Sequence, residues 1–206
     1  TVSAWLRRLG LSRPAAPPRV RVRRYEWPHP GDLLHVDIKP LARIRTVGHR
    51  IHGDRRRTAR GVGWEYVHVA IDDHSRVASV EVLSDQRGNT CAGFLQRSVA
   101  WFAARAITVR RVMSDNGSGY VSRRFRAACQ ALALRHIRTR PYTPRTNGKA
   151  ERFIQTLLRE WAYVVAYPSS RGRTRQLERF LGCYNRRRPH ASLDYHAPWS
   201  RLPSAA

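Results

Sequence analysis

Three carboxylates could do chemistry in a chain that has few of them. The sequence holds 39 Lys and Arg but only 14 Asp and Glu. Asp37 lies inside the apolar stretch LLHVDI, Asp115 follows the apolar stretch ITVRRVM, and Glu151 lies in an amphipathic stretch after a turn-rich run. If the fold brings the three acids together, they would repel one another. Mg²⁺ ions would relieve that repulsion because they bind carboxylate oxygens, and two such ions can support phosphodiester displacement.

Each acid also has a simpler explanation when it is taken alone. Asp37, as a buried charge, could pair with an arginine. Asp115 begins the sequence DNG, which is typical of a turn. Glu151 could be favoured by the positive end of a helix dipole, or it could pair with Lys149 or Arg152. The metal hypothesis therefore depends on whether separate elements place the three side chains at one point.

The hydrophobic pattern predicts the elements that must position these acids. Apolar runs bounded by turn residues predict three strands with short links, which favours an antiparallel meander. Helical periodicity then alternates with two further strands. The expected strands are residues 33–38, 65–71, 77–83, 107–113 and 135–138, and the expected helices are residues 91–105, 121–134, the stretch that carries Glu151, and 173–187. This order predicts an α/β fold with one mixed five-stranded sheet (three antiparallel and two parallel strands) and helices on both faces.

Such a sheet would let the three acids meet. The strand with Asp37 and the strand before Asp115 can be neighbours, and the helix with Glu151 can lie beside both. Asp115 would then lie at the carboxyl end of its strand, where α/β sheets usually place their sites. For the polar residues nearby we expect structural roles: His35 as a packed histidine, Asp72 and Asp73 in the turn between strands, and Asn147 in a turn or helix cap.

The excess of positive charge indicates a polyanionic partner. The formal net charge is +25, and nucleic acid is the expected partner because each neutralised phosphate releases counterions. An arginine-rich composition of every surface is the alternative. The only lysines, Lys39 and Lys149, each lie two residues from a proposed ligand and could contact phosphate. The candidate DNA contacts are Lys149, Lys39, Arg152, Asn116, Arg145, Arg56, Arg57 and Arg187.

Other site types and compartments are disfavoured by the composition. The three cysteines, Cys91, Cys129 and Cys183, are isolated, which argues against a zinc finger and against a disulfide framework. No apolar run is long enough to span a bilayer, and we see no signal peptide. We therefore expect an intracellular protein without a membrane partner.

Four stretches carry a resemblance to a known family. They are LLHVDIK with Asp37, VAIDDHSR, VMSDNGSGY with Asp115, and PYTPRTNGKAERFIQTLLREW with Glu151. Together they resemble the catalytic core of DDE transposases and retroviral integrases, in particular the bacterial insertion-sequence transposases of the integrase-core type. Asp115 and Glu151 are separated by 35 residues, and this spacing resembles the one between the second Asp and the Glu of that family. The final stretch YNRRRPHASLDYHAPWSRL resembles the end of those transposases.

The resemblance implies a ribonuclease H-like fold and a DNA transposase. Asp37, Asp115 and Glu151 would be the catalytic residues and the ligands of two Mg²⁺ ions, with Mn²⁺ as a substitute. Hydrolysis at the transposon end would free a 3′-OH, which would then attack target DNA. The partners would be transposon ends and target DNA, held by a homodimer or a larger homo-oligomer in the bacterial cytoplasm, at the nucleoid.

The same comparison suggests a division of the chain. Because it opens on Thr1 and not on Met, we expect a piece of a longer protein. We expect residues 1–12 to be the remnant of a helix-turn-helix domain and residues 13–26 to be a basic linker. Residues 27–166 would be the catalytic core, and residues 167–206 a C-terminal helical and loop extension.

Three other functions are open alternatives. The chain could be a catalytically dead transposase relic that still binds DNA. It could be a ribonuclease of the same fold, which would cleave RNA–DNA hybrids. It could also be a basic structural nucleic-acid-binding protein, in which the three acids would have no special role.

Overall fold

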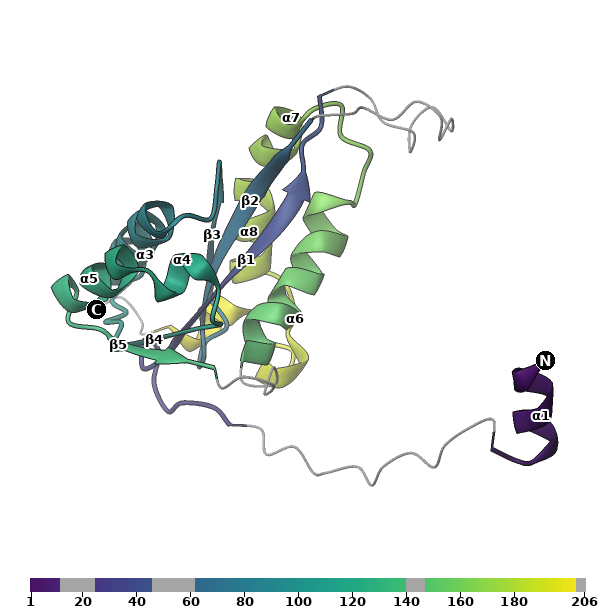
Figure 1. Cartoon of the computed structure of the whole chain (residues 1–206). Helices are drawn as coiled ribbons and strands as arrows, with labels where there is room; N and C mark the ends of the chain where they lie inside the picture. Colours follow the sequence, from purple (N-terminus) through teal and green to yellow (C-terminus); the bar gives the residue numbers. More distant parts are fainter. Residues whose placement is uncertain (12–24, 46–61, 140–146, 203–206) are drawn as a thin grey trace.

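Five strands form one mixed sheet in the order β3-β2-β1-β4-β5 (Figure 1). The computed structural model describes residues 1–11, 25–45, 62–139 and 147–202. The strands are β1 (Leu34–Ala42), β2 (Trp64–Asp72), β3 (Ala78–Leu83), β4 (Arg111–Ser114) and β5 (Arg135–Arg138). β1, β2 and β3 pair antiparallel, whereas β4 pairs parallel with both β1 and β5. The predicted meander with two parallel strands is confirmed.

Helices cover both faces of this sheet, as predicted (Figure 1). One face is covered by α3 (Gly88–Ala103), α4 (Ser118–Val121) and α5 (Arg123–Ala131). The other is covered by α6 (Gly148–Leu157), its continuation η2 (Leu158–Ala162), and α8 (Leu177–Arg186). The remaining described helices are α1 (Val2–Arg8), α7 (Ser170–Arg175), η3 (Ala191–Leu193) and η4 (Pro198–Arg201).

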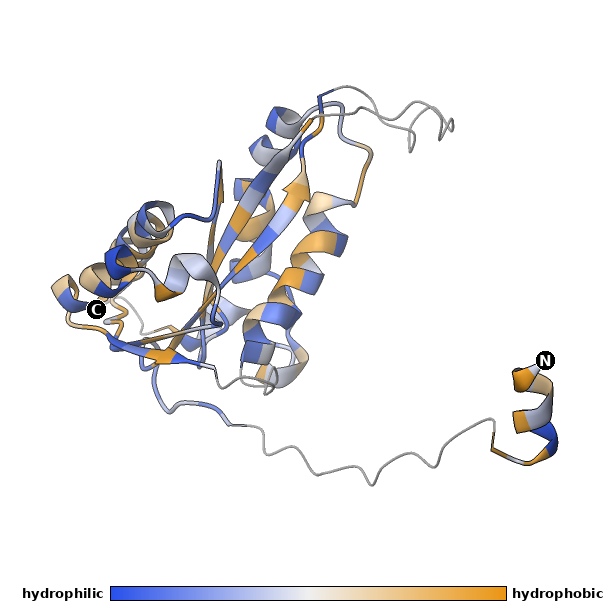
Figure 2. Cartoon of the chain, in the orientation of Figure 1, coloured by the Kyte–Doolittle hydropathy of each residue, from blue (hydrophilic) through white to orange (hydrophobic). Residues whose placement is uncertain are grey.

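The two faces of the sheet hold two separate hydrophobic cores, and β1 contributes to both. Leu34 and Val36 are buried with α3 and α5, whereas Leu41 is buried with α6. Side chains alternate along a strand, so Asp37 projects on the same face as Leu41, which is the face that α6 covers. Figure 2 shows the hydrophobic residues that run along β1, β2 and α6. The fold thus directs Asp37 towards the helix that carries Glu151.

β4 is shorter than the predicted strand 107–113. It begins at Arg111, although Ile107 and Val109 before it are buried. The neighbouring strand β1 begins at Leu34, which pairs with Val112, so residues 107–110 have no partner on β1. The Arg110 amide instead donates to the Gly31 carbonyl at 2.8 Å.

Two predicted helices are each divided. The helix predicted over 121–134 breaks at Ser122, whose backbone is extended and whose hydroxyl accepts a hydrogen bond from the Phe125 amide at 3.1 Å. Ser122 thereby caps the start of α5. The helix predicted over 173–187 is likewise two helices, α7 and α8. The helix of Glu151 ends as a five-residue π-helical turn that buries Trp161.

The first helix, α1, does not contribute to the core. α1 buries none of its side chains. The division of the chain at residues 12, 26 and 166 stays a prediction, as does the helix-turn-helix origin of residues 1–12. Across the described part of the chain, the helices are all too short or too polar to cross a membrane.

Candidate active site

The parallel pairing of β1 with β4 brings Asp37 and Asp115 together. Leu34 pairs with Val112 and His35 pairs with Met113. Continuing this register by two residues on each strand places Asp37 beside Asp115. Both residues line one small cavity, which also has Gln86, Ser118 and Tyr120 in its wall. The carboxylate of Asp37, within β1, and that of Asp115, directly after β4, therefore face a shared space.

Asp37 has no cationic partner within ion-pair distance among the described residues. Its Oδ1 accepts a hydrogen bond from the Ile38 amide at 2.7 Å. Burial raises the pKa of Asp37 from 3.8 to about 6; the Ile38 amide opposes this rise, and repulsion from Asp115 and Glu151 adds to it. The arginine pairing considered for Asp37 is therefore absent from the described part of the chain. These surroundings suit a carboxylate that binds a cation.

Asp115 is both a turn residue and a cavity residue. Its side chain is exposed, and its Oδ1 accepts a hydrogen bond from the Gly117 amide at 2.9 Å. The Asn116 side chain donates to the Thr139 carbonyl at 2.9 Å, which ties the turn to the segment after β5. The turn explanation and the site explanation are thus compatible, because the turn is what aims the carboxylate at the cavity.

Glu151 lies in the first turn of α6 and is exposed. It is near enough to Asp37 to raise the pKa of that carboxyl, although it does not line the cavity that Asp37 and Asp115 share. Within the described ranges, no three His, Cys, Asp or Glu side chains are close enough together to hold a metal ion. The structure therefore assembles two of the predicted ligands and leaves the third nearby.

The chemistry of these donors suits a hard divalent cation. Asp37, Asp115 and Glu151 offer carboxylate oxygens, which Mg²⁺ and Mn²⁺ accept as ligands. A cation between Asp37 and Asp115 would offset the burial and repulsion that raise the pKa of Asp37. Mg²⁺ commonly binds through one or two carboxylates and keeps several waters, so a pair of carboxylates is enough to begin such a site.

Lys149 and Asn147, at the start of α6, have roles that the sequence did not indicate. The Lys149 ammonium is bound to the Asp73 carboxylate and donates to the Tyr25 carbonyl at 2.9 Å. Asn147 occupies the N-cap position, but its side chain makes no capping hydrogen bond and is buried against His35 instead. The predicted cap role of Asn147 is therefore wrong, because its side-chain amide contacts His35 and the Val36 carbonyl on β1 instead of the backbone of α6.

The other predicted structural residues behave as expected. His35 is fully buried, and Asp72 and Asp73 order the turn after β2. The Asp72 carboxylate accepts hydrogen bonds from the Ser75 amide and hydroxyl, both at 2.7 Å. Asp73 does more than shape the turn, since it also accepts from the Trp27 amide at 2.8 Å. The sequence signal for that role is only the acidic pair in VAIDDHSR.

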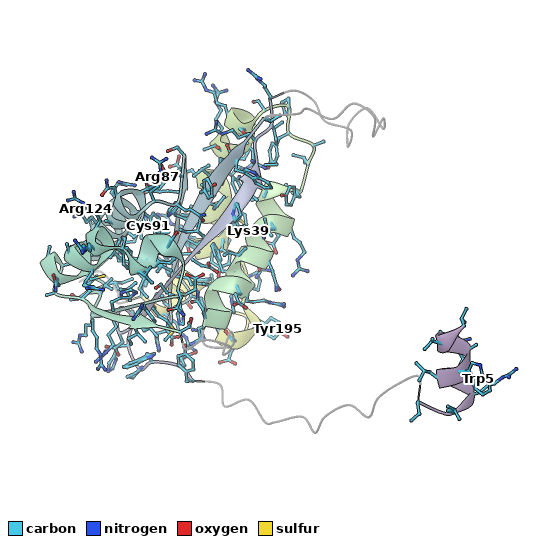
Figure 3. The ribbon with its side chains drawn as sticks, viewed as in Figure 1. Trp5, Lys39, Arg87, Cys91, Arg124 and Tyr195 are labelled. Atoms are coloured by element: carbon cyan, nitrogen blue, oxygen red, sulfur yellow. The ribbon has the colours of Figure 1, made fainter. Side chains whose placement is uncertain are left out.

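The described candidates for DNA contacts come from different elements of the fold. Lys39 projects from β1 beside α6 (Figure 3), and the structure gives it no ion pair with any described residue. Arg152 is exposed on α6 and its guanidinium donates to Gln155 at 3.3 Å. Arg187 is exposed directly after α8. Three further candidates lie outside the described residues: Arg56, Arg57 and Arg145.

Asp37→Asn should stabilise the protein when divalent metal is removed. A rise of the pKa from 3.8 to about 6 corresponds to roughly 3 kcal/mol that the charged form costs at pH 7. Because the pKa is raised, the folded state binds a proton at Asp37 more tightly than the unfolded state does. The cost to stability therefore grows as the pH rises from about 4 to about 6, and it is fully present above that range. We expect urea unfolding in EDTA to show a gain of up to about 3 kcal/mol at pH 7 and little gain near pH 4.

The matched control is Asp85→Asn, which should have the opposite sign. The Thr90 hydroxyl and the Arg87 amide hold the pKa of Asp85 below its ordinary value, so its charge is favourable in the folded state. A loss of stability in Asp37→Asn at pH 7 would show that its carboxylate already has a compensating partner.

Comparison with known proteins places this arrangement in a class. Two family profiles, each described as Integrase core domain, match residues 28–144 and 132–198. The first of these covers more than half of the chain. The chain belongs to the integrase core domain family.

The similar sequences include proteins of insertion elements. An uncharacterised protein of insertion element IS136 from Agrobacterium fabrum is 34% identical over 96 residues, which are 47% of this chain and 49% of that protein. The putative transposase InsD for insertion element IS2E from Escherichia coli is 30% identical over 94 residues, 46% of this chain and 43% of that one. The chain thus matches about half the length of these curated relatives.

The similar structures include retroviral integrases. The HTLV-2 integrase catalytic core domain, solved in complex with magnesium, matches with a TM-score of 0.59 at 14% identity, over 85% of this chain and 99% of that one. A chain of the simian T-cell lymphotropic virus intasome matches with a TM-score of 0.66 at 19% identity, over 92% of this chain and 64% of that one. At such low identity the likeness shows the ribonuclease H-like fold of integrase cores.

Proposed function

We propose that this chain is the catalytic core of a DNA transposase. It would cut one strand at each end of a mobile element and join the freed 3′-OH to target DNA. The observation that supports this most is the pair formed by Asp37 and Asp115, which face one cavity whose described lining has no Lys or Arg. The family and the insertion-element relatives supply the reaction class.

Asp37, Asp115 and Glu151 would hold two Mg²⁺ ions, or Mn²⁺ in their place. When bound, such ions supply an activated nucleophile and stabilisation of the leaving oxygen in phosphodiester displacement. The pairing of β1 with β4 sets the first two carboxylates side by side, so they would bind a cation with little reorganisation. Glu151 would complete the ligand set from the first turn of α6. No serine, tyrosine or cysteine nucleophile is needed.

Basic residues around the site would hold the DNA. Lys39, on the strand of Asp37, and Arg152, next to Glu151, would contact phosphates beside the scissile bond. Asn116 and Arg187, together with Arg56, Arg57 and Arg145, would make more distant contacts. Lys149 would take part only if it left Asp73. The net charge of +25 supports DNA as the partner, and joining two element ends calls for a homodimer or larger assembly in the bacterial cytoplasm.

Strand joining is the test of this function. The protein would be incubated with labelled duplexes that carry the ends of its element, a supercoiled target plasmid, and Mg²⁺ or Mn²⁺. We expect a shortened strand with a free 3′-OH and a labelled plasmid product, both lost in EDTA. DNA binding without either product would identify a dead relic, and cleavage of RNA–DNA hybrids alone would identify a ribonuclease.

A further inference from the structure

A buried carboxylate next to the site links three distant parts of the chain. The side chain of Asp73 is completely buried in the turn after β2. Its Oδ1 lies 2.7 Å from His35 Nε2 and also binds the Lys149 ammonium, while its Oδ2 accepts from the Trp27 amide at 2.8 Å. Asp73 therefore joins β1, α6 and the segment before β1. Burial alone would raise the pKa of Asp73, but the hydrogen bonds with His35, Lys149 and the Trp27 amide lower it to about 2. The carboxylate therefore stays ionised.

His35 extends this connection to a second point on α6. It is fully buried on β1, two residues before Asp37, and its Nδ1 lies 3.1 Å from Asn147 Oδ1. The Asn147 amide nitrogen donates to the Val36 carbonyl at 3.3 Å. Asn147 thus contacts β1 at the two residues directly before Asp37. We refer to His35, Asp73, Asn147 and Lys149 as the α6 latch.

The latch holds the part of α6 from which Glu151 projects. Glu151 follows Asn147 by four residues, a spacing that places the two on the same side of a helix one turn apart. Lys149, between them, holds the helix to Asp73 in the turn after β2. Two separate attachments fix both the position and the rotation of this turn relative to β1. Asp37 lies on β1 beside the first attachment.

We propose that the α6 latch positions Glu151 so that it can join Asp37 and Asp115 in holding a divalent cation. This inference rests on the proposed function of the three acids. Like charges on Asp37, Asp115 and Glu151 push the first turn of α6 away from β1, and repulsion from the other two acids already contributes to the raised pKa of Asp37. The contacts of the latch oppose that force. They make Asn147, Lys149, His35 and Asp73 positioning residues, because none of them touches the reacting atoms.

A thermodynamic cycle with Mn²⁺ binding separates positioning from ordinary packing. Mn²⁺ affinity would be measured by calorimetry for the wild type, Asn147→Ala, Glu151→Gln and the double variant. We expect Asn147→Ala to weaken binding by about 10–100-fold, as is usual when a residue that orients a metal ligand is removed. In the Glu151→Gln background, Asn147→Ala should change the affinity by less than about twofold, because the ligand that it positions is already gone.

Two results would overturn the latch. One is unchanged Mn²⁺ affinity in Asn147→Ala; the other is the same loss of affinity whether or not Glu151 is present. Lys149→Met is a second variant in case Asn147→Ala does not fold, and it should show the same dependence on Glu151. The control is Glu65→Gln, which breaks a buried ion pair with Arg173 and should lower stability without altering Mn²⁺ affinity.

Hydrogen exchange tests the latch without metal. Asn147→Ala should speed amide exchange in residues 148–154 and leave exchange in α5 unchanged. Equal protection of residues 148–154 in the wild type and in Asn147→Ala would contradict the attachment.

The Mn²⁺ titration of the wild type distinguishes a failure of the latch from a failure of the proposed function. A wild type that binds no Mn²⁺ contradicts the proposed function of the three acids, and the positioning role with it. A wild type that binds Mn²⁺ as tightly as Asn147→Ala contradicts the latch alone.

Discussion

Glu151→Gln is expected to reduce DNA strand cleavage and joining by about 10³-fold or more, which is the size of loss seen when one member of a catalytic unit is removed. Gln keeps the size of the side chain and removes the charge that a divalent cation needs. Glu151 is exposed and forms no ion pair with a described residue, so the substitution should leave folding intact. DNA binding should be unchanged or stronger, because a negative charge near the phosphates is lost.

The control for this result is Glu178→Gln. Glu178 is also an exposed acid in the first turn of a helix, α8, so it matches Glu151 in type, exposure and position relative to a helix dipole. We expect it to retain wild-type cleavage. Full activity in Glu151→Gln would exclude this glutamate as a ligand, whereas equal losses in both variants would point to a general effect of surface charge.

The second large effect concerns stability. Arg173→Met should lower the free energy of unfolding by about 3–5 kcal/mol, because it leaves the Glu65 carboxylate buried without its partner. The Arg173 side chain is 1% exposed and that of Glu65 is 10% exposed, with 2.5 Å between the guanidinium nitrogen and the carboxylate oxygen. The same guanidinium donates to the Ala42 carbonyl at 2.9 Å and so ties α7 to the end of β1.

Urea unfolding measures the loss of stability in Arg173→Met, and two further variants serve for comparison. Arg97→Met breaks an exposed ion pair with Glu81 and should cost less than about 1 kcal/mol. The double variant Glu65→Leu with Arg173→Met should recover much of the lost stability, because no buried charge is left uncompensated. A loss in Arg173→Met no greater than that in Arg97→Met would show that water reaches the Glu65 carboxylate.

Local patterns were sufficient to predict the sheet. Apolar runs and turn residues located the strands, and the change to helical periodicity located α3 and α6. The boundaries that differ depend on neighbours elsewhere in the chain. Residues 107–110 read as strand, but β1 offers them no partner. Ser122 lies inside an amphipathic stretch, and its capping hydroxyl divides the helix there.

The part of the site that follows from strand order could be predicted, whereas the part that depends on distant side-chain contacts could not. Adjacent parallel strands make Asp37 and Asp115 neighbours, and a strand order inferred from the sequence is enough to expect that. The partners of Asn147 and Lys149 were not predicted, because His35 and Asp73 lie 112 and 76 residues away in the sequence. Side-chain contacts over such separations leave no local pattern. The distance from Glu151 to the other two acids depends on those contacts.

A calorimetric titration of Mn²⁺ into the wild type and Asp37→Asn tests most directly whether the carboxylates form a metal site. It requires no knowledge of the DNA ends. We predict saturable binding by the wild type that is lost in Asp37→Asn, which should nevertheless be folded and more stable in EDTA. Absence of binding in both proteins at millimolar Mn²⁺ with DNA present, or equal binding in both, would contradict a metal centre at Asp37, Asp115 and Glu151.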